Sequence, residues 1–286
     1  MSVADPSGLT ATERRPHLVV RPPSRWAPLH LGEVWEFRDL AYRFVRRDLT
    51  LRYRQTALGV IWVIVQPLLA AGAFSFVFGK VAKLPSQGVP YFAFAYAGML
   101  AWNAFSSTLT KVSGSLVGNQ ALISKIFFPR LVLPLSTLGS TLVDFAVALG
   151  MMAVILGIVG IAPGWGVLML PVWLVVALLL ATGIGLAAAA LMVSYRDVAY
   201  VLPVATQLLL YASPIAYAVS SVPTSLRFAV DLNPLTGLLE GFRWSLLRTA
   251  APSPGAIACS AVASLAVFLA GAVVFTRMER KFADVI

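Results

Sequence analysis

The stretch FRDLAYRFVRRDLTLRYRQTALGVIWVIVQPLLAAGAF, residues 37–74, decides the fold because a basic segment meets an apolar segment in it without a linker. The apolar part is uncharged and long enough to cross a bilayer as a helix. Wound as a helix, the basic part has an apolar face and an arginine-rich face, although Asp48 falls on the apolar side. This pattern is typical of a helix in the cytoplasmic headgroup layer, and a basic anchor that merely orients the protein is the alternative. The apolar face carries Phe37, Leu40, Ala41, Phe44 and Leu51, and the other carries Asp39, Arg43, Arg46, Thr50 and Arg54.

The composition indicates an integral membrane protein. Of the 286 residues, 59% are hydrophobic and only 12% are charged, whereas a soluble domain carries about twice that charged fraction. The net charge of +10 would suggest nucleic acid in a soluble protein, but here the arginines crowd beside apolar segments. Attraction to anionic membrane lipids therefore explains the charge, and no nucleic-acid partner is expected.

Six apolar segments are predicted to cross the membrane as helices, because a helix needs about 20 residues to span the hydrocarbon layer. The third is too long for a straight crossing, so we expect a tilt or a break near Pro134. The polar, Pro- and Arg-rich residues 1–30 are expected to form a disordered cytoplasmic tail without a cleavable signal peptide. The six segments are residues 58–78, 92–112, 131–160, 166–193, 199–220 and 255–276.

The distribution of basic residues predicts the orientation of these spans. If the N-terminus lies inside the cell, all but five of the 22 Lys and Arg residues fall in cytoplasmic segments. Because cytoplasmic segments of membrane proteins are enriched in Lys and Arg, both termini are expected in the cytoplasm. The five exceptions are Lys80, Lys83, Arg227, Arg243 and Arg248.

The cytoplasmic connection GSLVGNQALISKIFFPRLVLP, residues 114–134, is amphipathic rather than polar. Apolar side chains surround its Lys125. Exposed apolar groups need a cover, so this connection is expected to bind a protein partner or the membrane surface. The apolar group consists of Leu122, Ile123, Ile126, Phe127 and Phe128.

The external connection, residues 212–254, is too long and too apolar for a simple turn. Asn233 followed by Pro234 predicts the start of a helix, with Asn as the N-cap and Pro at the first helical position. Glu240 and Arg243 stand three residues apart on that helix, so we expect them to pair. An apolar helix on the outer side is expected to dip back into the membrane where protein shields its backbone.

No catalytic or metal site is predicted from the sequence. The Gly79-Lys80 pair lacks the glycine spacing of a P-loop, and neither a serine-protease elbow nor a metalloprotease motif occurs. His17 and His30 lie in or beside the N-terminal tail and cannot form a metal site with Cys259, which sits in an apolar segment. Any energy source for work by this protein is therefore expected on another chain.

Asp144 is the one acid clearly inside a predicted span, which makes it a candidate functional residue. A proton-coupled carrier usually needs more than one carboxylate together with a partner. We therefore favour a structural role, in which Asp144 pairs with a basic residue in the cytoplasmic half of its span.

Polar and aromatic residues recur on two predicted spans. Tyr200, Gln207 and Tyr211 share one face of the fifth span, and Trp62 and Gln66 stand four residues apart in the first. Aromatic rings stack on sugars and amides bind their hydroxyl groups, so the pattern favours a polar translocation path. Interfacial aromatic belts are the alternative, which accounts for Tyr200 and Trp62 but poorly for the glutamines.

Five blocks occur in order along the chain. They are LTLRYRQTALGVIWVIVQPLL (49–69), NQALISKIFFPRLVLPL (119–135), SYRDVAYVLPVATQLLLYASPIAYAVSSVP (194–223), LNPLTGLLEGFRW (232–244) and ERKFADVI (279–286). Together they resemble the permease subunit of type-2 ABC exporters for polysaccharides, a family with O-antigen, capsule, teichoic-acid and galactan exporters. The resemblance covers nearly everything from residue 31 to 286.

The resemblance implies an all-α integral membrane protein that works as a homodimer in the cytoplasmic (inner) membrane. It implies two copies of a separate cytoplasmic ABC ATPase, which would bind the ATP and Mg, and export of a lipid-linked polysaccharide, as in lipopolysaccharide biosynthesis. The chain itself would then be a transporter subunit rather than an enzyme, with no cofactor or metal of its own. The pore would lie between the two permeases.

The resemblance also implies roles for three segments of a transmembrane domain over residues 31–286. Residues 31–54 resemble an interfacial gate helix, 118–130 a coupling segment that contacts the ATPase, and 223–250 external re-entrant helices. Candidate residues of the gate helix are Phe37, Arg43, Phe44, Arg46, Arg47 and Arg54; those for coupling are Asn119, Leu122, Lys125, Phe127, Phe128 and Arg130; and those of an external gate are Glu240, Arg243 and Trp244.

Two other functions stay open at this point. A type-2 ABC exporter of a small lipid or drug would share the fold, although such a path needs no glutamines. A membrane glycosyltransferase or flippase without ATP coupling belongs to a different class. An enzyme of that kind would need paired carboxylates near a membrane face, and Asp144 has no such neighbour in the sequence.

Overall fold

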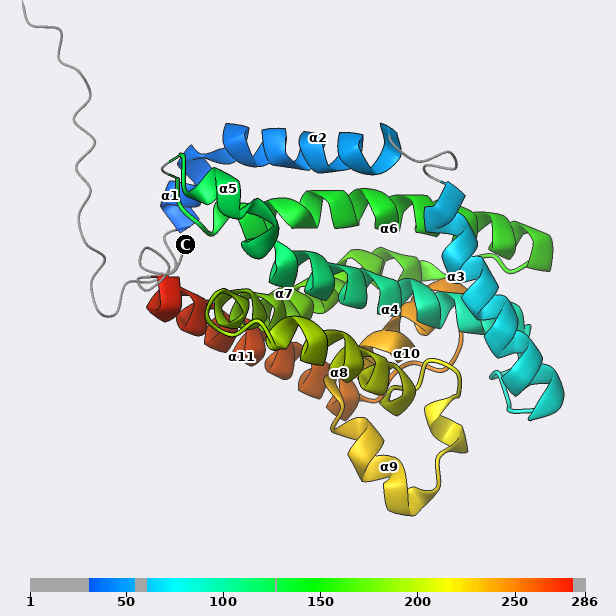
Figure 1. Cartoon of the computed structure of the whole chain (residues 1–286). Coiled ribbons are helices and arrows are strands. Elements are labelled where there is room, and N and C mark those ends of the chain that lie inside the picture. The colour runs from blue at the N-terminus through cyan, green and yellow to red at the C-terminus, as the bar shows by residue number, and fades with distance from the viewer. Residues whose placement is uncertain (1–30, 55–60, 127, 280–286) are drawn as a thin grey trace, which may run out of the picture.

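The computed structural model describes residues 31–54, 61–126 and 128–279, and the regular elements in these ranges are all helices (Figure 1). The predicted all-α class is confirmed. The chain begins with α1 (Leu31–Glu36) and α2 (Arg38–Arg54). The longer helices that follow are α3 (Ile61–Phe74) with its π-helical continuation η1 (Ser75–Val81), α4 (Tyr91–Gly114), α6 (Val132–Val159), α7 (Leu170–Ser194), α8 (Val198–Ala212) and α11 (Pro254–Glu279). The connections contain η2 (Val117–Asn119), α5 (Gln120–Ile123), η3 (Trp165–Met169), η4 (Val219–Ser221), α9 (Thr224–Asp231) and α10 (Pro234–Leu247).

Four helical stretches within the described residues are long and apolar enough to cross a membrane. They coincide with the first, third, fourth and sixth spans predicted from the sequence. The stretches are Ile61–Val81, Val132–Val159, Trp165–Ser194 and Pro254–Glu279.

The second and fifth predicted spans correspond to α4 and α8. Helix α4 has 24 residues, but its C-terminal half carries hydroxyl, amide and amino side chains that lower its hydropathy. Helix α8 has 15 residues and is therefore about 22 Å long, which is shorter than the hydrocarbon layer of about 30 Å. A count of six crossings thus stays a prediction.

The break expected near Pro134 is absent, because α6 runs as one helix of 28 residues. Pro134 is the third residue of this helix, where its missing N–H has no intrahelical partner to lose. The uninterrupted helix is about 42 Å long, so a tilt is the way it would fit a bilayer of ordinary thickness.

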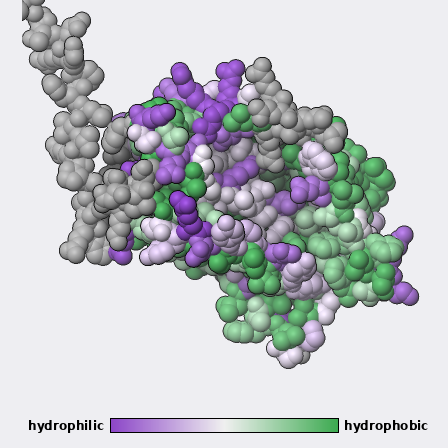
Figure 2. Space-filling view, viewed as in Figure 1, coloured by the Kyte–Doolittle hydropathy of each residue, from purple (hydrophilic) through white to green (hydrophobic). Residues whose placement is uncertain are grey.

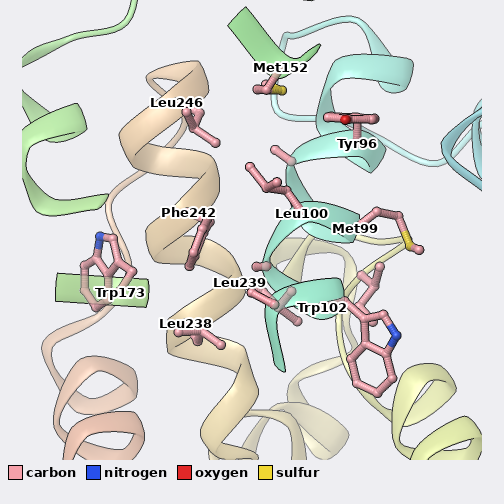
Figure 3. Close-up of a cluster of buried hydrophobic side chains, with 14 of the residues drawn as sticks. Tyr96, Met99, Leu100, Trp102, Met152, Trp173, Leu238, Leu239, Phe242 and Leu246 are labelled. Carbon is pink, nitrogen blue, oxygen red and sulfur yellow. The ribbon is translucent and has the colours of Figure 1, made fainter. Parts of the chain in front are cut away.

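Helix α4 lies at the centre of the described bundle and contacts α3, α6, α7 and α10. Figure 3 shows Leu239 and Phe242 of α10 and Leu100 of α4 within one buried cluster. The Tyr96 hydroxyl donates to the carbonyl oxygen of Ala148 at 3.0 Å, which joins α4 to α6. Small side chains on α4 allow its neighbours to approach closely, as is typical of helices that pack in membranes. The buried alanines of α4 are Ala93, Ala95, Ala97, Ala101 and Ala104.

Helices α7 and α11 make the closest backbone approach, through two glycines. A Cβ at Gly271 would overlap the carbonyl oxygen of Gly183, and a Cβ at Gly183 would lie 2.6 Å from the backbone nitrogen of Phe268. No side chain fits between the two backbones. The pair Gly183 and Gly271 therefore sets the distance between α7 and α11.

We predict that Gly271→Val destabilises the protein, because a side chain there forces α7 and α11 apart. Overpacking a tight contact costs about 1–3 kcal/mol. Gly157→Val is the matched control, since a Cβ at Gly157 meets nothing within 4 Å. Thermal unfolding in detergent, followed by size-exclusion chromatography, should show a lower midpoint for Gly271→Val alone. Equal midpoints for the two variants would contradict the close approach.

Candidate functional site

The amphipathic helix α2 packs alongside α6 (Figure 1). Phe44 is buried, Phe37 and Leu40 are half-buried, and a Cβ at Gly139 of α6 would lie 2.6 Å from Val45. The apolar face predicted from the sequence is therefore present, but protein covers much of it where lipid was expected. Leu51, which was assigned to that face, is exposed. Figure 2 shows hydrophilic residues gathered over the outer side of α2.

Arg47 connects α2 to the segment between α4 and α6. Its Nη2 atom lies 2.9 Å from Asp48 Oδ1 and donates to Asn119 Oδ1 at 2.8 Å. The Asn119 side chain in turn donates to the Ser115 carbonyl oxygen at 2.8 Å, at the end of α4. Asp48, which the sequence placed on the apolar side of α2, also accepts a hydrogen bond from Arg47 Nε at 3.1 Å. The hydrogen bond between Arg47 and Asn119 joins residues that are 72 apart in the chain, so the sequence pattern could not predict it.

The coupling candidates differ in their surroundings. Phe128 is only 6% exposed, and its ring lies 5.9 Å from the ring of Phe44. The expectation that Phe128 is available to a protein partner is therefore wrong, because α2 already covers it. Phe127 lies outside the described residues. Arg130 donates to the Glu279 carbonyl oxygen at 2.8 Å, which ties this segment to the end of α11.

The surface of the coupling segment is formed by other residues. Lys125 is exposed, and Ile126 is 53% exposed although it is apolar. Val117 in η2 is exposed to a similar extent, while Leu122 is half-buried against the core beneath α2. The apolar area open to a partner is thus carried by Ile126 and Val117 instead of the phenylalanines.

The residues predicted for a translocation path all lie on the outside of the described chain. Trp62 and Gln66 of α3 are exposed, as are Tyr200, Gln207 and Tyr211 of α8. Both helices contact α4. The structure of one chain leaves these side chains on an uncovered face, and their facing a common path stays a prediction.

A cleft of about 440 Å³ lies between α3, α4 and α6, and half of the residues that line it are polar. Lys111 Nζ lies 2.8 Å from Asp144 Oδ2 and donates to Ser140 Oγ at 3.1 Å. The expected pairing of Asp144 with a basic residue is confirmed, and the pair lines the cleft. The polar members of the lining are Gln66, Asn103, Ser106, Ser107, Thr110, Lys111, Thr141 and Asp144.

The cleft residues on α4 were not identified from the sequence, although a signal was present. Asn103, Ser106, Ser107 and Thr110 recur at spacings of three and four residues and so share one helical face. This spacing is the signal in the sequence that points to a polar face on α4.

Arg243 occupies a buried position in α10, where it is 2% exposed. Its Nη1 atom donates to the Pro214 carbonyl oxygen at 2.8 Å and to that of Tyr217 at 3.4 Å, and its Nη2 atom donates to the Ile215 carbonyl oxygen. The guanidinium carbon lies 3.8 Å from the centre of the Phe94 ring of α4. Arg243 therefore fastens the segment that follows α8 to the centre of the bundle.

The predicted ion pair between Glu240 and Arg243 is wrong in its geometry. The Arg243 side chain turns inward to the carbonyl groups, and among the described residues its hydrogen bonds go to these oxygens alone. Glu240 is half-buried on the same helix and accepts none of them. Gly98 is required beside Arg243, because a Cβ there would lie 2.7 Å from the guanidinium.

Helix α10 follows the predicted start signal. The Asn233 side chain accepts a hydrogen bond from the Leu235 backbone N–H at 3.0 Å, and α10 begins at Pro234. Helix α10 packs against α4, α7 and α11, whereas α9 is largely exposed. Trp244 stands edge-on to Trp165 of η3, with ring centres 4.9 Å apart.

We predict that Arg243→Lys lowers thermal stability, because an ammonium group cannot reach three carbonyl oxygens in the planar arrangement of a guanidinium. A hydrogen bond to a charged group contributes about 1.5–3 kcal/mol, so the midpoint should fall by roughly 5 °C. Arg248→Lys is the control, since Arg248 is exposed and donates at 3.3 Å to a single carbonyl oxygen, that of Pro163. An equal decrease of the unfolding midpoint in both variants would contradict a stabilising role of the buried Arg243 hydrogen bonds.

Comparison with known proteins adds to this geometry. An O-antigen export system permease protein RfbA of Myxococcus xanthus is 26% identical over 254 residues, which cover 88% of this chain and 97% of the relative. Two proteins of the same name from Klebsiella pneumoniae are each 25% identical over 252 residues, or 87% of this chain and 95% of the relative. A family model described as ABC-2 type transporter matches residues 40–247. Since this match covers well over half of the chain, the chain belongs to the ABC-2 type transporter family of membrane proteins.

Proposed function

We propose that this chain is the permease subunit of an ATP-driven transporter that exports a lipid-linked polysaccharide across the cytoplasmic membrane. The proposal rests on the match of 87–88% of the chain to relatives named O-antigen export system permease proteins, together with its membership of the ABC-2 type transporter family. Six helical spans, formed by α3, α4, α6, α7, α8 and α11, would place both termini in the cytoplasm. The buried helix α10 would be the re-entrant element on the outer side.

The energy would come from a separate ABC ATPase, which binds the ATP and Mg. The sequence contains no P-loop, so this chain has no nucleotide site of that type. Two copies of the ATPase would assemble with a homodimer of permeases. The exposed Ile126 and Val117 of the cytoplasmic connection supply the apolar contact that such a partner needs.

Movement of the ATPase would reach α2 through contacts already made in the structure. The Arg47 to Asn119 hydrogen bond and the contact between the rings of Phe44 and Phe128 connect the coupling segment to α2. When the coupling segment shifts, α2 is drawn with it. This supports a role for α2 as a gate at the cytoplasmic entrance, with Arg43 and Arg46 exposed toward anionic headgroups.

The path for the polysaccharide would run between the two permeases, along the exposed faces of α3 and α8. An amide that is buried without a partner costs roughly 1–3 kcal/mol, so Gln66 and Gln207 are poorly suited to face lipid. Trp62 and Tyr211 offer rings on which sugars stack. Weak and repeated contacts suit a polymer that must slide, whereas one tight site would stall it.

We predict that Ile126→Asp abolishes co-purification of the ATPase expressed with this chain, because it places a charge in an apolar contact. Leu226→Asp is the matched control, since Leu226 is a similarly exposed apolar residue on α9, which lies far from α5 in Figure 1. Both variants should insert and elute as the parent does. Normal ATPase recovery with Ile126→Asp would contradict docking on this segment.

A further inference from the structure

The cleft between α3, α4 and α6 has a polar wall formed by one face of α4. Asn103, Ser106, Ser107 and Thr110 lie on that face, whereas the buried Ala93, Ala95, Ala97 and Ala101 of α4 do not line the cleft. Gln66 of α3 completes the opening of the cleft. The polar groups thus come from different helices and converge on one volume of about 440 Å³.

The polar side chains of this wall are available to form hydrogen bonds with a bound ligand. Within the described residues, the side chains of Gln66, Asn103, Ser106 and Ser107 form no hydrogen bond. Hydrocarbon chains offer them none either, and each unpaired group of this kind costs roughly 1–3 kcal/mol. This wall of the cleft therefore suits a polar occupant, while much of the rest of the lining, which includes Met99 and Phe145, is apolar.

The charges in the cleft argue for an uncharged occupant. Lys111 is held 2.8 Å from Asp144, so this cation and anion neutralise one another. This ion pair therefore provides no net positive charge that would attract a phosphate group. The Thr110 hydroxyl donates to the Ser106 carbonyl oxygen at 2.9 Å, which leaves its oxygen as an acceptor. The amides supply both donors and acceptors, as sugar hydroxyl groups require.

We propose that this cleft binds a neutral sugar unit of the exported chain within each protomer, through Asn103, Ser107 and Gln66. The identification of the ligand rests on the proposed function. The site is separate from the exposed face of α8, and it adds α4 to the surfaces that contact the polysaccharide. The ion pair of Lys111 and Asp144 acts as its rigid, neutral end and positions α4 against α6.

The test uses the complete permease–ATPase complex in detergent and a neutral oligosaccharide repeat unit released from the host glycan. Asn103→Leu combined with Ser107→Ala should weaken oligosaccharide binding about tenfold or more, since two hydrogen bonds are lost. Thr276→Val is the control, because the Thr276 hydroxyl bonds its own helix on α11, outside the cleft. Equal binding by the double variant and the parent would overturn the proposal.

A second variant covers the case in which the double variant fails to fold. Ser107→Cys in a Cys259→Ala background should react with a water-soluble maleimide, and the oligosaccharide should protect it. Protection by inorganic pyrophosphate in place of the oligosaccharide would overturn the assignment to a neutral sugar, as would an unreactive Cys at this position. ATP-dependent glycan export by the parent complex is measured in parallel. If export persists while binding in the cleft fails, the proposed function stands without this site.

Discussion

Hydrocarbon offers no hydrogen bonds, so each polar group buried in the bundle must find its partner within the protein or in a bound ligand. Arg243 meets this constraint together with the carbonyl groups of Pro214 and Ile215, which lose their helical partners because α8 ends at Ala212. One side chain thus satisfies several groups at once. Lys111 and Asp144 meet the same constraint by pairing between α4 and α6.

Small residues make these polar contacts possible. Gly98 leaves room for the Arg243 guanidinium, and the close pair of Gly183 and Gly271 brings α7 and α11 together. The alanines of α4 allow this helix to sit at the centre while its remaining face stays polar. The same helix therefore supplies both the packing core and the wall of the cleft. One part of the surface of α4 packs against neighbouring helices, and another part carries the polar side chains.

The class of fold, four spans and the start of α10 followed from the sequence, because composition, span length and the Asn233 cap act locally. The pairing of Asp144 also followed, since an isolated acid in a span needs a basic partner. The burial of Phe128 and the inward turn of Arg243 did not. Both depend on which distant segment covers the side chain, and apolar periodicity or a spacing of three residues carries no such information.

Transport of a glycan by this chain should consume ATP that a partner hydrolyses. Proteoliposomes that contain the chain and its co-expressed ATPase, with lipid-linked glycan in the membrane, test this most directly. The readout is the change, with and without ATP, in the amount of glycan that an added glycosidase can cleave. We expect transfer that needs ATP, this chain and the ATPase together. Transfer at the same rate without ATP, or without the ATPase, would contradict it.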